Sequence, residues 1–438
     1  MNPSLRERWM RARAQSDQLF AMVRPDALYD RPIPERHRII FYVGHLEAFD
    51  WNLLQEGLGL KTLDASLDRL FAFGIDPVDG GLPSDQLGDW PSQPQVQDYS
   101  RRVRRGLELA MNGKRTANAL CASTNGGTSD VLMNVAIEHR LMHVETLAYM
   151  LHQLPLDRKA RQAQAEVPAV PAPQSGVVEI PQGSATLGSV RSSGSFGWDN
   201  EFESQVADTP AFAIDRHKIS NGQFLEFVRA GGYRERGVWS EAGWNWIQRQ
   251  GIEHPAFWRR QAGEWFLRTM FEEIPLPLHW PVYVSHAEAS AYASWSGKRL
   301  PTEAEWHRAA YGTSSGAERD YPWGEEAPAP LRGYFDLERW DPGPVNAFSE
   351  SRSAFGVEGM LANGWEWTAS RFEPFSGFEP FSFYPGYSAN FFDGLHYVLK
   401  GGSTRTEACM LRRSFRNWFQ PHYQYVYAGF RCAAEGGL

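Results

Sequence analysis

The stretch SDVLMNVAIEHRLMHVETLAYMLHQL, residues 129–154, has the apolar spacing of a long helix and contains neither proline nor glycine. Three segments that precede it show the same periodicity, and breaks containing proline or glycine separate them. These segments are LRERWMRARAQSDQLFAMV (5–23), ERHRIIFYVGHLEAFDWNLLQEGL (35–58) and VQDYSRRVRRGLELAM (96–111). Four long amphipathic segments predict a four-helix bundle over residues 1–156.

The rest of the chain differs in composition. Residues 157–176, DRKARQAQAEVPAVPAPQSG, contain prolines, alanines and charged residues but few large apolar ones, which is typical of an exposed linker. Residues 177–438 are rich in Gly, Trp, Phe and Tyr and contain many turns and short helical patterns such as HAEASAYASW (286–295). This region is predicted to be a separate α+β domain with much irregular structure.

Charge and hydropathy exclude several classes of partner. The formal net charge is -8 and no run of five basic residues occurs, which argues against nucleic acid or an anionic membrane as the main partner. The N-terminal residues lack the apolar core of a signal peptide, and no apolar run reaches the roughly 18 residues that span a bilayer. We therefore expect a cytoplasmic protein. Its cysteines, Cys121, Cys409 and Cys432, are too sparse for a disulfide framework and are expected to be buried thiols.

Two histidines of the long helical stretch stand four residues apart. At about 100° per residue, His139 and His143 share one helix face, so that both imidazoles are able to bind one ion. Glu145 is turned to a different side, and a third ligand from another segment is required. The best candidate is His45, which follows Gly44 among apolar residues of the second segment. Three neutral imidazoles suit iron(II), copper or zinc, although the same spacing also occurs in helices that bind no metal.

Seven motifs follow one another in the C-terminal region. They are FGWDNE (196–201), KRLPTEAEW (298–306), YPWG (321–324), NGWEWTAS (363–370), KGGS (400–403), RRSFRNW (412–418) and AGFRCA (428–433). With the lone histidine of the second segment and the H-x3-H-x-E of the fourth, they resemble the ergothioneine sulfoxide synthases, the EgtB-type enzymes. The resemblance covers nearly the whole chain. It implies a DinB-like four-helix bundle followed by a formylglycine-generating-enzyme-like domain, with the sulfatase-modifying-factor, C-type-lectin-like fold.

This resemblance also implies the site. The bundle would hold a mononuclear non-haem iron(II) on His45, His139 and His143, with open positions for substrates and O2. The second domain would bind hercynine, the trimethylated histidine that becomes substituted at imidazole C2. Asn417 and Trp418 match the family residues that bind hercynine.

Two tyrosines of FYPGYSANFF (383–392) are further candidates by resemblance. Tyr384 is the counterpart of the active-site tyrosine of the family, and Tyr387 that of a second tyrosine that touches substrate. Aromatic faces recognise quaternary ammonium groups, and a phenol that is neutral at pH 7 is able to donate a hydrogen bond or a proton.

Some positions depart from the sulfur enzymes. Phe419 and Tyr423 stand where the synthases that use γ-glutamylcysteine have an Asp and an Arg for the donor's ammonium and carboxylate. A charged amino-acid end would lose its partners there, which predicts a donor other than γ-glutamylcysteine. Met142 replaces a glutamine that contacts hercynine in some relatives, and ANGW (362–365) replaces the usual GN-x-W.

Aromatic residues in place of charges fit a neutral, sugar-like donor. The stretch RPIPERHRIIFYVGHLEAFDWNLL (31–54) resembles the selenoneine synthase (SenA) branch, which joins hercynine to a seleno-sugar, and the first prediction is therefore formation of a carbon–selenium bond. The alternative is a carbon–sulfur bond with cysteine or another thiol, because arginines near DYSRRVRRG (98–106) bind the donor carboxylate in the sulfur enzymes. Arg101 or Arg102 would then hold the donor, unless they form a solvated helix face.

Three other classes fit less well. A metal-free binding module would be indicated by loss of one of the three histidines, and all three are present. A copper-dependent formylglycine-generating oxidase needs a cysteine pair in the C-terminal core, whereas Cys409 and Cys432 are far apart in sequence. Zinc-dependent hydrolysis is set aside on the family resemblance alone.

Overall fold

The computed structural model describes residues 3–72, 82–112, 129–163, 167, 170–174 and 176–436. Cys121 lies outside these described residues. The chain forms two compact units, Met1–Gln162 with Phe381–Pro385, and Ala163–Pro380 with Gly386–Leu438. A short segment of the C-terminal half therefore packs with the N-terminal helices.

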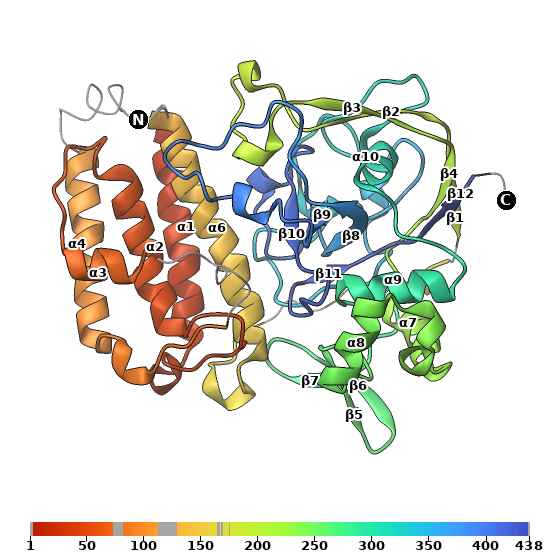
Figure 1. The fold of residues 1–438 in the computed structure, drawn as a ribbon, viewed down its shortest axis with the longest axis horizontal. Coiled ribbons are helices and arrows are strands. Elements are labelled where there is room, and N and C mark those ends of the chain that lie inside the picture. The colour runs from red at the N-terminus through yellow and green to blue at the C-terminus, as the bar shows by residue number, and fades with distance from the viewer. Residues whose placement is uncertain are drawn as a thin grey trace. The chain divides into compact units, whose positions relative to one another are not determined.

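The first unit is a bundle of long helices (Figure 1). The helices are α1 (Pro3–Met22), α2 (Ile39–Leu54), α4 (Gln93–Asn112) and α6 (Ser129–Gln153), with the short α3 (Ala65–Leu70) against α2. α1 packs against α6, and α2 packs against both α4 and α6. The predicted helical bundle is confirmed. α2 begins at Ile39, later than residue 35, because the backbone of Arg38 is extended.

A network of charged side chains is buried in the bundle. Arg140 donates through Nη1 to Glu47 at 3.0 Å and through Nη2 to Asp50 at 2.9 Å, and all three residues are buried. Arg13 lies 3.4 Å from the Glu47 carboxylate, and Arg104 lies 2.7 Å from it. These residues come from α6, α2, α1 and α4, so the network connects all four long helices.

The second unit is built around a four-stranded sheet with the order β10-β9-β8-β11 (Figure 1). Its strands are β8 (Gly364–Arg371), β9 (Tyr397–Gly402), β10 (Asn417–Phe419) and β11 (Ala428–Gly429). β9 is antiparallel to β8 and β10, whereas β11 is parallel to β8. β10 is therefore an edge strand, and Trp418 on it faces Val398 of β9.

Three smaller sheets complete the described part of this unit. They are β1-β4-β12 (Val177–Ile180, Phe212–Asp215, Ala433–Glu435), β2-β3 (Gly183–Leu187, Gln205–Thr209) and β5-β6-β7 (Trp258–Gln261, Glu264–Arg268, Glu273–Pro275). The pairing of β12 with β4 joins the end of the second unit to its beginning. The prediction of a mixed α and β region is confirmed.

The helices of the second unit are α7 (Asn221–Arg229), α8 (Glu241–Gln250), α9 (His286–Trp295) and α10 (Glu303–Tyr311). α7, α9 and α10 each begin with a capping box, in which two side chains three residues apart bond each other's backbone N–H groups. In KRLPTEAEW these are Thr302 and Glu305. The motif thus starts the helix that packs on β8 and β9.

The sequence motifs meet one another through buried polar contacts. Arg431 of AGFRCA donates to both oxygens of Glu366 of NGWEWTAS, at 2.6 and 2.8 Å. Trp306 of KRLPTEAEW donates to the same carboxylate at 3.0 Å. Arg416 of RRSFRNW donates to Glu303 at 3.0 and 3.1 Å. Removing one partner of such a buried pair leaves an uncompensated charge, so single substitutions of these motif residues are expected to destabilise the fold.

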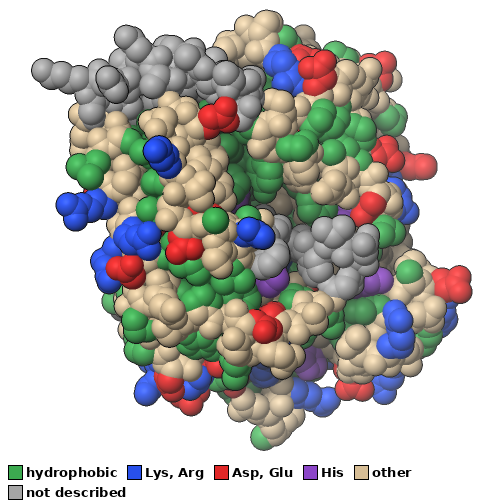
Figure 2. Space-filling model, turned by 60° about the vertical axis from the view of Figure 1, so that its left-hand side comes forward, with side chains coloured by type: hydrophobic (Ala, Val, Ile, Leu, Met, Phe, Trp, Pro, Cys, Tyr) green, Lys and Arg blue, Asp and Glu red, His purple; other side chains and the backbone are tan. Residues whose placement is uncertain are grey.

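The surface and the thiols show no unusual feature in the described residues. On the described atoms of the face drawn in Figure 2, acidic and basic side chains are interspersed and neither sign forms a continuous patch. None of the described helices is both long enough and apolar enough to cross a membrane. Cys409 is partly exposed and Cys432 is buried, and neither forms a disulfide with another described residue.

Candidate metal centre

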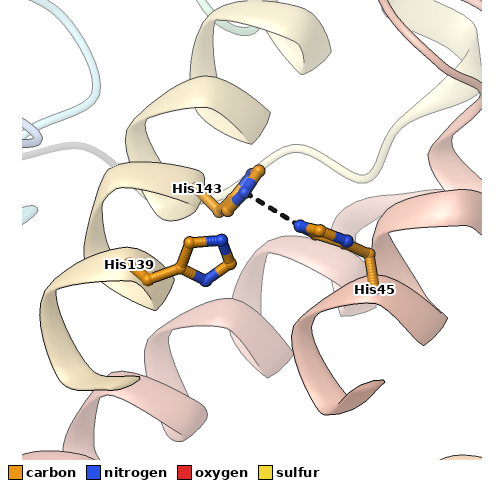
Figure 3. A group of neighbouring side chains, drawn as sticks. All are labelled: His45, His139 and His143. Carbon is orange, nitrogen blue, oxygen red and sulfur yellow. Dashed lines mark hydrogen bonds between the residues drawn. The ribbon is translucent and has the colours of Figure 1, made fainter. Parts of the chain in front are cut away.

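Three histidines converge inside the bundle. His45 projects from α2, and His139 and His143 project from α6 toward it (Figure 3). All three side chains are buried, and one ring nitrogen from each lies within 4.8 Å of the others. The Nε2 atoms of His45 and His143 are 3.2 Å apart. Two nitrogens that each lie about 2.1 Å from one ion at a right angle would be about 3.0 Å apart, so the spacing fits shared coordination.

The hydrogen bonds of these rings provide an independent test of metal binding. Three ring nitrogens are buried and have no hydrogen-bond partner among the described residues. They are Nδ1 and Nε2 of His139 and Nδ1 of His143. Buried polar atoms nearly always have a partner. A cation held by the three rings would supply the missing interaction on the side where they meet, so the residues fit a metal ion.

The protonation state of the rings also suits a metal. Burial lowers the pKa of His45 to about 4, even though its hydrogen bond to the Phe71 carbonyl acts in the opposite direction. Burial and the neighbouring histidines lower the pKa of His139 and of His143 well below the usual value. The three imidazoles are therefore neutral at pH 7, and each has a nitrogen lone pair available for coordination.

The sequence around His45 explains its orientation. Nδ1 of His45 donates to the backbone oxygen of Phe71 at 2.7 Å, which leaves Nε2 unprotonated and directed at the other histidines. Gly44 allows this contact, because a Cβ atom at that position would lie 2.4 Å from Cζ of the Phe71 ring. The Gly–His pair noted in the sequence thus has a packing reason.

No carboxylate from the described part of the chain joins the three histidines. In the described residues, the one group of at least three potential ligands consists of these imidazoles alone, and Glu145 is not part of it. This agrees with the prediction that Glu145 does not join the pair on its own helix.

Tyr384 lies beside the centre. It belongs to Phe381–Pro385, the segment that packs with the bundle. Its ring centroid is 6.4 Å from that of His139 and 5.4 Å from that of Phe49. The structure therefore brings one of the two candidate tyrosines close to the predicted ligands.

Three of the predicted substrate residues meet in the second unit. Tyr387 and Trp418 have ring centroids 5.4 Å apart in a T-shaped arrangement. Asn417 precedes Trp418 on β10, and its side-chain oxygen accepts a hydrogen bond from the backbone N–H of Trp418 at 2.9 Å. We call Tyr387, Trp418 and the rings around them the aromatic cluster.

Sequence reasoning missed further members of this aromatic cluster. Trp198 stacks on Tyr387 at 3.9 Å, and Phe372 stacks on Trp418 at 4.1 Å with an angle of 7° between the planes. Phe391 lies 5.6 Å from Trp418. Trp198 is part of the FGWDNE motif and could have been found there, whereas nothing in the sequence distinguishes Phe372 from other phenylalanines.

Phe419 and Tyr423, which replace the charged donor-binding residues of the sulfur enzymes, belong to a second group of rings. Phe419 and Tyr423 stack at 5.1 Å with an angle of 9° between the planes, and Tyr425 packs edge-on against Tyr423 at 5.5 Å. These three rings, which we call the aromatic ladder, are partly exposed. They present flat faces where the sulfur enzymes are expected to present charges.

The two arginines proposed as a donor clamp lie on α4. Arg101 pairs with Asp98 at 3.1 Å, and its side chain is 69% exposed. Arg102 donates to the carbonyl oxygen of Leu63 at 3.3 Å, and its side chain is 45% exposed. Both form part of a solvated helix face, and binding of the donor by them stays a prediction.

Comparison with known proteins agrees with the geometry. Residues 163–436 match the family described as sulfatase-modifying factor enzyme 1-like domain. Three similar proteins are named hercynine oxygenase. The one from Mycolicibacterium thermoresistibile is 35% identical over 78% of this chain and 80% of its own length, and that from Mycolicibacterium smegmatis is 36% identical over 77% and 81%.

The third of these proteins, from Mycobacterium tuberculosis, is 43% identical, but the match covers only 54% of this chain and 55% of that relative. The chain thus spans about half of this relative and about four fifths of the other two. The matches to the two Mycolicibacterium proteins extend into the helical unit, because they cover a larger share of the chain than the second unit occupies. The chain therefore belongs to the hercynine oxygenase family, with a sulfatase-modifying factor enzyme 1-like domain as its C-terminal unit.

Proposed function

We propose that the protein is a non-haem iron(II) enzyme that uses O2 to join hercynine, at imidazole C2, to a sulfur donor. The observation that carries this proposal is the buried, neutral cluster of three histidines with unsatisfied ring nitrogens in a chain of the hercynine oxygenase family. In the balanced reaction, the C2–H of hercynine, the S–H of the donor and O2 give a sulfoxide bonded to C2 and one water.

His45, His139 and His143 are the proposed iron ligands. These three neutral imidazoles would hold the ion, and bound iron(II) would supply the activation of O2 and coordination positions for it and the substrates. No carboxylate of the described residues competes for those positions, because the potential ligand group contains histidines only.

The aromatic cluster is the proposed site of the hercynine trimethylammonium. A quaternary ammonium makes no ordinary hydrogen bonds, but it is attracted to the faces of Trp and Tyr rings. The planes of the Trp418 and Tyr387 rings are inclined by 78°, and Asn417 lies next to them. Each ring has one face stacked on a neighbouring ring, so the proposed contact is with the opposite face. The side-chain oxygen of Asn417 accepts a hydrogen bond from the backbone N–H of Trp418. Its NH2 group is therefore suited to donate to the hercynine carboxylate.

Tyr384 is the proposed proton donor. A phenol is protonated at neutral pH, and this one lies beside the ring of His139. It would donate a hydrogen bond or a proton to a reacting group near the three histidines.

Replacing Trp418 with alanine is expected to weaken hercynine binding about 30-fold, because a desolvated cation–π contact contributes about 2 kcal/mol. The iron content should not change, since Trp418 lies on β10 of the second unit. Titration calorimetry with hercynine and metal analysis would measure both. Trp295→Ala on α9, where the side chain is 37% exposed, is the matched control. Unaltered hercynine affinity in Trp418→Ala would remove this ring from the site.

A seleno-sugar is the second candidate donor, supported by the aromatic ladder. Stacked rings bind the C–H face of a neutral sugar, whereas they offer no countercharge to an amino-acid end. Arg101 and Arg102 are the groups that would instead bind a thiol's carboxylate. With a selenol in place of the thiol, the same balance gives a selenoxide at C2 and water. Elimination of the sugar would leave a selenenic acid at C2, and two equivalents of an added thiol would reduce it to selenoneine, with a disulfide and water as the other products.

One assay tests the reaction and the donor together. Iron(II)-loaded protein would be incubated with hercynine in air and, in parallel, with cysteine, γ-glutamylcysteine or a 1-seleno-sugar, and the products analysed by mass spectrometry. A hercynyl-cysteine sulfoxide supports the sulfur reaction, whereas selenoneine from the sugar alone supports the second candidate. An oxygen-free incubation serves as the control. Iron-loaded protein that forms no C2-substituted product with any donor would contradict the proposal.

A further inference from the structure

The three histidine rings are held in place in different ways. The Phe71 carbonyl fixes the ring of His45 through a hydrogen bond of 2.7 Å. His139 has no hydrogen bond at either nitrogen among the described residues. Its closest aromatic neighbour is Phe49, whose ring centroid lies 3.4 Å away with an angle of 10° between the two planes.

A metal-binding histidine normally needs an outer partner. Its second nitrogen usually donates to a carbonyl or a carboxylate, which fixes the tautomer and the rotation of the ring. Without that partner, rotation of His139 about its Cβ–Cγ bond is limited by packing alone. The rings of His143 and His45 lie at 4.5 and 5.3 Å and are steeply inclined, so Phe49 is the ring that covers a face of His139.

The place of Phe49 in the helix explains this contact. It follows His45 by one helical turn on α2, so both side chains point to the same side of the helix. Its ring contacts His139 on α6, and it also lies 5.4 Å from Tyr384. One side chain therefore links a predicted ligand to the predicted proton donor.

We propose that Phe49 is a positioning residue for the metal centre and orients the His139 ring by stacking, as the Phe71 carbonyl orients His45 by a hydrogen bond. The inference rests on the proposed metal centre. A purely structural role would affect the stability of the bundle but leave the geometry of the bound metal unchanged.

Phe41 provides a matched comparison. It lies on the same helix and stacks on His45, at 4.8 Å with an angle of 25°. Its side chain is fully buried, whereas that of Phe49 is only partly buried. The hydrogen bond to Phe71 holds His45 in place even when Phe41 is altered. Substitution of Phe41 should therefore reduce stability more than metal affinity, whereas substitution of Phe49 should reduce metal affinity more than stability.

The experiment compares Phe49→Leu and Phe41→Leu in the full chain. The probes are Fe(II) affinity, the visible absorption spectrum of the Co(II)-loaded protein, and thermal unfolding of the metal-free protein. Phe49→Leu should bind Fe(II) about 10- to 100-fold more weakly, as for other residues that orient a ligand, and should alter the Co(II) spectrum. Phe41→Leu should lose more stability and keep the wild-type spectrum. Phe49→Tyr, which retains a flat ring, should restore affinity and spectrum.

Two failures are distinguishable. Wild-type protein that binds neither Fe(II) nor Co(II) would refute the metal centre itself. Wild-type protein that binds both metals, together with a Phe49→Leu variant of equal affinity and identical Co(II) spectrum, would overturn the role of Phe49 and leave the metal centre intact.

Discussion

The variant His139→Ala is expected to lose both bound iron and turnover. One of the three nitrogens that meet in the bundle disappears, and no carboxylate of the described residues stands ready to replace it. The loss of metal affinity should exceed the roughly 100-fold that follows from removing an outer partner of a ligand. Metal analysis after gel filtration and the product assay with hercynine would measure the two effects.

His152→Ala is the matched control for this experiment. His152 is also buried and lies on α6, but it is not part of the group of potential ligands. This variant should retain iron and activity even if its stability falls. Full activity in His139→Ala would disprove the metal assignment, and loss of iron in both variants would indicate general damage to α6.

The variant Arg140→Met is expected to lower the free energy of unfolding by about 3–5 kcal/mol at pH 7, since it removes the fully buried cation that two buried carboxylates share. Arg140 is fully buried and donates to Glu47 and Asp50. Whole domains are stable by only about 5–15 kcal/mol, so the loss is large. Denaturant unfolding of the metal-free protein would measure it. Arg101→Met, on an exposed face, should change stability by no more than about 0.5 kcal/mol.

The same loss should depend on pH. Burial by itself raises the pKa of Glu47, but the guanidinium groups of Arg140, Arg13 and Arg104 outweigh burial and lower it from 4.5 to about 2. A carboxyl group with a lowered pKa stabilises the fold above its unfolded value and loses this effect as the pH falls through its folded value. The penalty of Arg140→Met should therefore be complete at pH 7 and shrink from pH 4.5 toward about 2. A penalty that stays constant over this range would contradict the pairing.

The helices and the His139–His143 pair were predictable because both depend on spacing within a segment, whereas His45 comes from a different helix. Apolar periodicity predicts α6, and a separation of four residues places His139 and His143 on one face. The same rule explains why neighbouring arginines of α4 differ. Arg104 follows the buried Val103 and reaches Glu47, whereas Arg101 points to solvent. Periodicity predicts which face is buried, but it does not predict that a buried face carries a charged network.

Contacts between distant segments were not predictable from these patterns. The return of Phe381–Pro385 to the helical unit joins residues far apart in the chain, and no periodicity encodes it. The stacking of Phe49 on His139 and of Phe372 on Trp418 likewise depends on tertiary packing. The resemblance suggested residues for the site, whereas the structure shows which side chains pack against them.

The edge position of β10 bears on how such enzymes diversify. β10 has three residues and is hydrogen-bonded to β9 alone, and the aromatic ladder begins at its last residue, Phe419, and continues outside any strand. The buried pairs that join the motifs, such as Arg431 with Glu366 and Arg416 with Glu303, involve none of the ladder residues. Under the proposed function, the residues that select the donor lie at the edge of the sheet and outside the buried pairs. A few substitutions there would change the donor during evolution and leave the rest of the domain intact.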